Sequence, residues 1–163
     1  MGTATSRNQG FTLVEILIVV VILGILAAIV IPQFTSASES AKAGSVMTQL
    51  QTIRSQLSLY QIQHQGVYPT LAELQAGWGV MLEKTDADGT INAAGKFGPY
   101  LQKEPVNPFT SSSLLAAGTS EADGAATDGW AYDEDDGGTG TAGDTGNIWA
   151  VGFDEATETF TKP

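Results

Sequence analysis

Apolar residues gather in one long run near the start of the chain and become sparser afterwards. In residues 11–31, 18 of 21 positions are apolar, and the exceptions are Thr12, Glu15 and Gly24. A helix of this length spans about 31 Å at about 1.5 Å per residue, which matches the hydrocarbon core of a bilayer. The pattern therefore predicts a membrane-spanning helix over residues 11–32.

Two other kinds of segment share a long apolar run. Its length argues against both, and Glu15 argues further against a signal peptide. A core helix of a soluble protein rarely holds about 18 almost wholly apolar residues, and the apolar region of a signal peptide is usually about 7–15 residues long. A carboxylate in hydrocarbon costs roughly 2.5–3.5 kcal/mol unless a partner offsets its charge. The sequence has no cationic residue within helical reach of Glu15. We therefore expect the counter-ion to come from elsewhere, such as an amine made by cutting the chain just upstream.

After Pro32 the apolar positions recur every three or four residues, which is the spacing of one face of a helix. These positions are Val46, Leu50, Ile53, Leu57 and Tyr60. The polar residues between them, including Arg54, are expected to face water. No proline interrupts residues 33–65, and Gly66 is a natural stop. We predict that the helix continues through residues 33–65 with its stripe covered by a head, and that His64 has a capping or surface role.

Residues 66–163 are expected to form this head. Thr70 followed by Glu73 is the pattern of a capping box at the start of a short helix. The segments at 130–132 and 147–151 are typical of two strands whose aromatic residues pair across a hairpin.

Residues 110–146 are rich in Ser, Thr, Gly, Ala and Asp, which predicts a long surface loop with Leu114 and Leu115 among its few apolar anchors. The predicted fold class is α+β: a long N-terminal helix packed against a small C-terminal head with a short antiparallel sheet and long loops.

Composition excludes several classes of function. The 163 residues include 7 Lys and Arg against 18 Asp and Glu, so the net charge of −11 argues against a nucleic-acid partner. The sequence has no cysteine and a single histidine, which excludes thiolate chemistry and leaves few ways to build a catalytic centre. We therefore predict no enzyme and no certain cofactor. A membrane-tethered periplasmic enzyme or binding domain, with the acidic loop beside Trp130 or Trp149 as its site, is the less favoured alternative.

Acidic residues concentrate in the second half of the sequence, where residues 104–158 hold 12 of them and no Lys or Arg. Asp133, Asp135 and Asp144 fall at the first, third and twelfth places of an EF-hand loop, and oxygen-rich loops suit calcium. Gly137 occupies the fifth place, where an oxygen ligand is usual, and the flanks are typical of strands. The three aspartates are candidate calcium ligands, and a solvated acidic turn is the alternative.

The segment GFTLVE at residues 10–15 resembles the processing site of type IV prepilins and of the pseudopilins of type II secretion. The resemblance implies that residues 1–10 are a leader, which a prepilin peptidase removes by cutting between Gly10 and Phe11. The new N-terminal residue, Phe11, would then be N-methylated.

The same resemblance implies how copies of the chain assemble. Glu15 would pair with the ammonium of Phe11 on a neighbouring subunit, so that two charges leave the hydrocarbon together. Gly24 and Pro32 would bound a stretch of helix that can lose its hydrogen bonds in a filament. Pro32 itself lacks an N–H and favours a kink there.

Segments further along resemble the major pseudopilin of type II secretion more narrowly: YPT at 68–70, GPYL at 98–101 and PVNPF at 105–109. The resemblance, together with the lack of the disulfide that closes many surface pilins, implies a periplasmic homopolymer that drives folded cargo outward. Its subunits would be single-pass proteins of the bacterial inner membrane with periplasmic heads. Their partners would be membrane lipid, the prepilin peptidase, the assembly platform and minor pseudopilins. A type IV pilus subunit for adhesion, motility or DNA uptake is the alternative.

Overall fold

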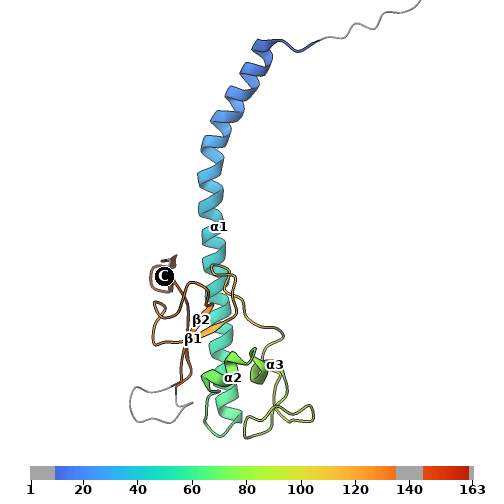
Figure 1. Cartoon of the computed structure of the whole chain (residues 1–163), viewed down its shortest axis with the longest axis vertical. Coiled ribbons are helices and arrows are strands. Elements are labelled where there is room, and N and C mark those ends of the chain that lie inside the picture. Colours follow the sequence, from blue (N-terminus) through green and yellow to red (C-terminus); the bar gives the residue numbers. More distant parts are fainter. Residues whose placement is uncertain (1–9, 135–144, 162–163) are drawn as a thin grey trace, which may run out of the picture. The chain divides into compact units, whose positions relative to one another are not determined.

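The computed structural model describes residues 10–134 and 145–161 of the chain. One long helix, α1, runs from Leu13 to Gln63, and it is followed by short helices, short strands and connecting segments (Figure 1). The chain divides into two compact units, Met1–Ser40 and Ala41–Pro163, and the second is called the head unit below. The predicted α+β class, with its long N-terminal helix, is confirmed.

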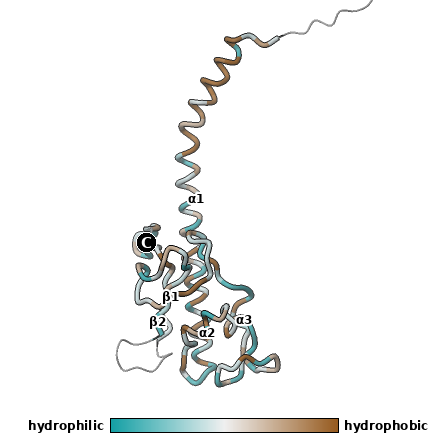
Figure 2. The backbone as a smooth tube through the Cα atoms, in the orientation of Figure 1, coloured by the Kyte–Doolittle hydropathy of each residue, from teal (hydrophilic) through white to brown (hydrophobic). Residues whose placement is uncertain are grey.

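In the first unit, residues 13–31 of α1 are almost wholly apolar, and Figure 2 draws most of this stretch in brown. Its large hydrophobic side chains, from Phe11 to Phe34, are between 50 and 81% exposed. α1 is the one helix of the described residues that is long and apolar enough to cross a membrane. The helix stays continuous through Gly24 and Pro32, so the loss of helical structure expected in a filament is not a feature of this single copy.

In the head unit, the amphipathic stripe of α1 forms the centre of the core. Val46, Leu50, Ile53, Leu57 and Tyr60 are all buried, as their spacing predicts. Two short helices, α2 (Leu71–Gln75) and α3 (Gly79–Leu82), contribute Leu74 and Met81 to the same core. The capping box predicted at the start of α2 is confirmed: the Glu73 N–H donates to Thr70, and the Glu73 side chain accepts from the Thr70 N–H.

A three-stranded sheet provides most of the remaining core. β1 (Leu115–Ala117), β2 (Trp130–Asp133) and β3 (Asn147–Ala150) lie in that order. β2 and β3 are antiparallel, as predicted, but β1 is parallel to β2, so the sheet is mixed rather than antiparallel. A second antiparallel pair, β4 (Phe153–Asp154) and β5 (Thr159–Phe160), follows.

One sequence-based expectation about this sheet is wrong. Trp130 faces Ala150 across the ladder and Trp149 faces Ala131, so the aromatic residues do not pair with one another. Residues two apart on a strand share a face, and both Trp130 and Tyr132 are buried in the core.

The segment at 110–146 is not one long loop, because β1 and β2 lie within it. Leu115 is buried there, but Leu114 is 59% exposed and anchors nothing. Residues next to each other on a strand point to opposite faces, so only one of two adjacent leucines can enter the core.

The proline-marked segment between α3 and β1 is fixed by hydrogen bonds from buried side chains. Trp130 Nε1 donates to the Pro105 carbonyl at 3.0 Å, and Trp78 Nε1 donates to the Ser113 carbonyl at 2.9 Å. The Asn107 amide donates to the carbonyls of Gly129 and Val151 at 2.9 and 3.3 Å. These bonds satisfy carbonyls that lie outside the strands, which is how a segment without regular structure lies stably across the core.

Candidate functional site

The first candidate site is the start of α1, where the predicted processing and assembly residues lie. Gly10 and Phe11 precede the helix, and the Phe11 side chain is 80% exposed. The Glu15 N–H donates to Thr12 Oγ1 at 3.2 Å, while the Thr12 N–H and hydroxyl each donate to Glu15 Oε2 at 3.4 Å. This reciprocal arrangement is a capping box, which satisfies backbone donors that the first helical turn leaves free.

Sequence reasoning missed this cap, although the signal is present. Thr12-x-x-Glu15 is the same pattern that correctly predicted the start of α2 at Thr70 and Glu73. The charge of Glu15 by itself predicts only a need for a counter-ion. The structure shows that the carboxylate also has a local role, which holds it at the first turn within a few residues of Phe11.

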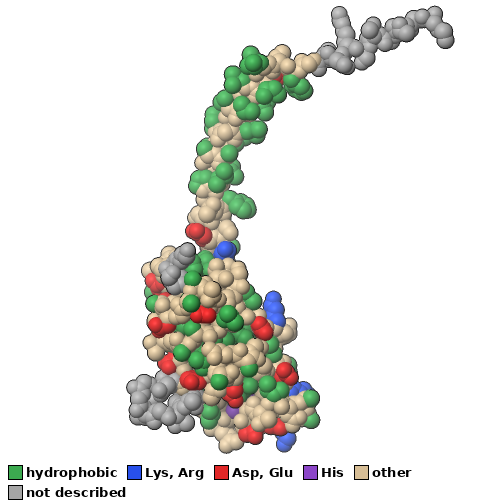
Figure 3. Space-filling model, in the orientation of Figure 1, with side chains coloured by type: hydrophobic (Ala, Val, Ile, Leu, Met, Phe, Trp, Pro, Cys, Tyr) green, Lys and Arg blue, Asp and Glu red, His purple; other side chains and the backbone are tan. Residues whose placement is uncertain are grey.

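The apolar surface that follows Glu15 has no partner within the described part of the first unit. A methyl group added at Gly24 would meet nothing within 4 Å, so this glycine does not allow a close contact inside the single copy. Figure 3 shows the hydrophobic side chains of this part of α1 standing free along it. Lipid or another helix is the kind of partner that such a surface takes.

A second cluster of charged groups lies in the head unit around Arg54. The Arg54 side chain is expected to face water, but it forms hydrogen bonds within the head unit. Its Nη1 and Nη2 atoms donate to the two oxygens of Glu155 at 2.8 and 2.6 Å, and Nη2 also donates to the Ile148 carbonyl at 2.6 Å. This is the only ion pair among the described residues. It joins α1 to β3 and to the turn before β5.

His64 is buried, which corrects the expected surface position, whereas the expected capping role fits its contact with a carbonyl of the last turn of α1. One ring nitrogen, Nδ1, lies 2.8 Å from the Tyr60 carbonyl, and Nε2 lies 2.9 Å from the Thr85 hydroxyl. The ring stacks on Tyr60 with centroids 3.7 Å apart, and Phe97 meets it edge-on. Both nitrogens are occupied, so His64 has the contacts of a core residue and not of a catalytic base.

The candidate calcium ligands are only partly within the described residues. Asp133 lies at the end of β2 opposite Asn147, whereas Asp135 and Asp144 lie outside the described residues. Glu134, next to Asp133, accepts a hydrogen bond from the Leu71 N–H at the start of α2. Across residues 10–134 and 145–161, no three acidic or histidine side chains converge as a metal site. The calcium site stays a prediction.

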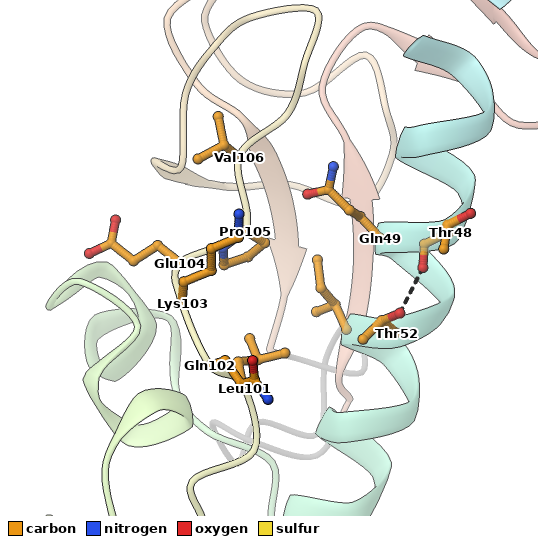
Figure 4. Close-up of a pocket in the computed structure, with 10 residues that line it drawn as sticks. Thr48, Gln49, Thr52, Leu101, Gln102, Lys103, Glu104, Pro105 and Val106 are labelled. Carbon is orange, nitrogen blue, oxygen red and sulfur yellow. Dashed lines mark hydrogen bonds between the residues drawn. The ribbon is translucent and has the colours of Figure 1, made fainter. Parts of the chain in front are cut away.

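The head unit also has an open groove of about 600 Å³ between α1 and residues 101–106 (Figure 4). Thr48, Gln49 and Thr52 line the α1 side, and Thr52 donates to the Thr48 carbonyl at 2.8 Å. The Glu104 carboxylate points away from α1 in this view and accepts from Ser113. This lining brings together no nucleophile and base, so the groove has no catalytic constellation.

Comparisons with known proteins agree with the geometry at the start of α1. The family model of the prokaryotic N-terminal methylation motif matches residues 5–31. A type II secretion system core protein G of Pseudomonas aeruginosa is 37% identical over 114 residues, which cover 69% of this chain and 77% of that relative.

A core protein G of Vibrio cholerae is 31% identical over 146 residues, which cover 89% of this chain and 94% of that relative. A ComG operon protein 3 homolog of Bacillus licheniformis is 34% identical over 70 residues, which cover 43% of this chain and 72% of that relative. No solved structure matches the chain.

Proposed function

Because the chain belongs to the family of the type II secretion system core protein G, the major pseudopilins, we propose that it is cut between Gly10 and Phe11 and polymerises through the apolar part of α1. A prepilin peptidase would make the cut, and Phe11 would be N-methylated. The chain is a membrane-anchored pseudopilin subunit, and the members of this family are structural proteins rather than enzymes.

The observation that carries this proposal is the free apolar surface of α1. Its side chains in the first unit are between 50 and 81% exposed, which no soluble monomer maintains over such a length. Lipid covers this surface before assembly, and the same surface of neighbouring copies covers it afterwards. Helices that leave lipid for one another gain packing contacts, and Gly24 permits close approach because nothing in its own chain lies against it.

Glu15 gives the assembly its register. A carboxylate in this apolar run is stable only beside a cation, and the described residues of the first unit contain none. Cleavage after Gly10 creates an ammonium on Phe11, and pairing it with Glu15 of the next copy removes both uncompensated charges. Pairing within one copy would leave nothing to align neighbours, so we propose that the pair forms between subunits.

The location and partners follow from the family as proposals. The subunit would sit in the bacterial inner membrane with its head in the periplasm. There the filament, with the assembly platform and minor pseudopilins, would drive folded cargo outward. Long extracellular fibres that disappear in a deletion strain would instead identify the subunit of a surface pilus.

Two measurements test the proposal. The intact mass of the purified mature protein should show loss of residues 1–10 and the gain of one methyl group. Retention of the leader under conditions where the peptidase is active would contradict it.

The replacement Glu15→Ala should leave membrane insertion intact and impair polymerisation. The matched control is Glu39→Ala, which removes an exposed acid of the same helix beyond the apolar run. Normal filament yield from Glu15→Ala, measured beside that control, would rule out the pairing.

A further inference from the structure

The α1 wall of the open groove can be covered without leaving its hydroxyl groups unpaired. The groove has a volume of about 600 Å³ and lies between α1 and residues 101–106 (Figure 4). On its α1 side, Thr48 Oγ1 donates to the Gly44 carbonyl at 2.9 Å, and Thr52 Oγ1 donates to the Thr48 carbonyl at 2.8 Å. Because these hydroxyls are satisfied within the helix, an occupant need not offer them hydrogen bonds.

The opposite wall combines exposed apolar surface with one uncompensated positive charge. The large hydrophobic side chain of Val106 is 46% exposed there. Lys103 is exposed and forms no ion pair with a described residue. The carboxylate of its neighbour Glu104 points away from α1 and accepts from Ser113 instead. The groove therefore suits an occupant that has a small apolar tip with negative charge beside it.

The charges of the head unit are divided between two parts of the chain. Lys84, Lys96 and Lys103 are exposed and form no ion pair with a described residue. Residues 104–158, by contrast, contain 12 acidic residues and no Lys or Arg. In Figure 3, the right-hand flank of the head shows Lys or Arg side chains, whereas the left-hand flank shows acidic side chains and no basic one. The head thus carries unpaired charges of opposite sign on different parts of its surface.

One loop of the acidic part has the shape and charge that this groove suits. Residues 118–129 connect β1 to β2 and are called the alanine loop. Glu121 and Asp123 lie in this loop and have no lysine or arginine near them in the sequence. The exposed apolar residues of the loop are three alanines, namely Ala122, Ala125 and Ala126.

Hydrogen bonds fix the alanine loop in place. The Asp123 carboxylate accepts from the N–H groups of Thr119 and Ser120 at 2.8 and 2.9 Å. These bonds lower the pKa of Asp123, so its carboxylate is ionised at neutral pH. The Gly152 N–H donates to the Glu121 carbonyl at 2.8 Å, which ties the loop to the connection between β3 and β4. A loop that is ordered before it docks loses less entropy on binding.

We propose that the groove receives the alanine loop of a second copy of this chain, with Lys103 beside Glu121 and Asp123 of that copy. This contact rests on the proposed filament and names the surfaces through which its heads meet. A contact between two identical grooves would bring Lys103 against Lys103, whereas the groove and the loop carry opposite charges. Two different surfaces of one chain form a heterologous contact, which continues from copy to copy as an open filament.

Pairs of introduced cysteines can test this contact in filaments of the full chain, because the sequence contains no cysteine of its own. A short bis-maleimide reagent should convert filaments of Gln102→Cys/Ala126→Cys into a ladder of covalent multimers, since each subunit would be joined to two neighbours. The matched control is Gln102→Cys/Ala93→Cys, which places the second cysteine at an exposed alanine outside the loop and should give no ladder. If the first pair does not assemble, Thr52→Cys/Ala125→Cys tests the same contact.

An exchange of charges tests the role of Lys103. Within the first cysteine pair, Lys103→Glu should reduce the ladder yield by about fivefold or more, because like charges then face each other. Adding Glu121→Lys should restore most of the yield, which a merely structural role of Lys103 would not explain. Lys84→Glu makes the same change of charge outside the groove lining and should leave the yield nearly unchanged.

Three outcomes would overturn the contact. Filaments that form normally but give no stronger ladder from Gln102→Cys/Ala126→Cys than from its control would overturn the contact and leave the proposed function standing. The same conclusion follows if Gln102→Cys reacts with a bulky maleimide as fast in filaments as in detergent, because the groove is then open to another occupant, such as cargo. Processed chains that form no filament at all would overturn the proposed function together with this contact.

Discussion

Removing the Arg54 side chain should destabilise the head unit more than an ordinary surface change does. The guanidinium makes three hydrogen bonds, two to Glu155 at 2.8 and 2.6 Å and one to the Ile148 carbonyl at 2.6 Å. These bonds join α1 to a strand and a turn that follow it by 94 and 101 residues in the sequence. Without them, β3 and the turn after β4 lose their only charged link to the helix among the described residues.

The expected loss of stability follows from how far the two charged side chains are exposed to water. The side chains of Arg54 and Glu155 are 39% and 29% exposed, so water screens the pair and its coupling is about 1 kcal/mol, near the upper end for surface pairs. Loss of the donor to the Ile148 carbonyl adds about 1 kcal/mol. We therefore expect Arg54→Met to lower the free energy of unfolding by about 2 kcal/mol. At about 4 °C per kcal/mol, Tm should fall by about 8 °C.

Thermal unfolding followed by near-ultraviolet circular dichroism, which reports on the packed tryptophans, measures this effect. A double-mutant cycle with Arg54→Met and Glu155→Gln isolates the ion pair, and its coupling should shrink in high salt. Lys103→Met is the matched control, because it removes an exposed cation that has no ion pair with a described residue. A coupling energy below about 0.3 kcal/mol, with an unchanged Tm for Arg54→Met, would refute the reasoning.

Three further perturbations test other features of the structure. Burial raises the pKa of Tyr132 above the ordinary value near 10. The free energy of unfolding should therefore be constant below that pH and fall above it, because only the unfolded tyrosine ionises. Urea unfolding from pH 8 to 11 should show a shallower fall in this free energy for Tyr132→Phe than for the unmodified chain. Gly146→Ala should lower the free energy of unfolding by about 1–3 kcal/mol, because its Cβ would lie 2.2 Å from the Tyr68 ring. Gly44→Ala, whose Cβ would meet nothing within 4 Å, should raise it by up to about 1 kcal/mol. Equal effects of the two variants in thermal unfolding would contradict this contrast. Thr12→Val should remove the N-terminal cap of α1 and reduce filament yield, but by less than Glu15→Ala does. A larger loss of filament for Thr12→Val than for Glu15→Ala would show that the cap matters more than the charge.

The features that could be predicted from the sequence are those whose signal is local. The stripe from Val46 to Tyr60 repeats every three or four residues, and one helix with one covered face is its simplest explanation. The capping box at Thr70 is likewise contained in four consecutive residues. Such patterns hold whatever the rest of the chain does, because the interacting groups are neighbours along the helix.

The features that could not be predicted depend on residues far apart in the sequence. β1 and β4 are three and two residues long, which is too short to show an alternation, and the parallel pairing of Leu115 with Trp130 has no turn to indicate it. The partner of Arg54 lies 101 residues later, in a segment with no pattern that points back to α1.

The two capping boxes share one sequence pattern, and the difference between them supports the proposed assembly. At α2, the Glu73 carboxylate accepts from Thr70 at 2.8 and 2.9 Å, whereas at α1 the Glu15 carboxylate accepts from Thr12 only at 3.4 Å. Bonds of 3.4 Å lie beyond the usual range of about 2.7–3.2 Å and stabilise a carboxylate weakly. Even a good cap adds no positive charge, so in hydrocarbon Glu15 still needs a cation. The long hydrogen bonds of this cap hold the carboxylate at the start of the helix. They compensate little of its negative charge, so the carboxylate can still form an ion pair with the amine of another copy.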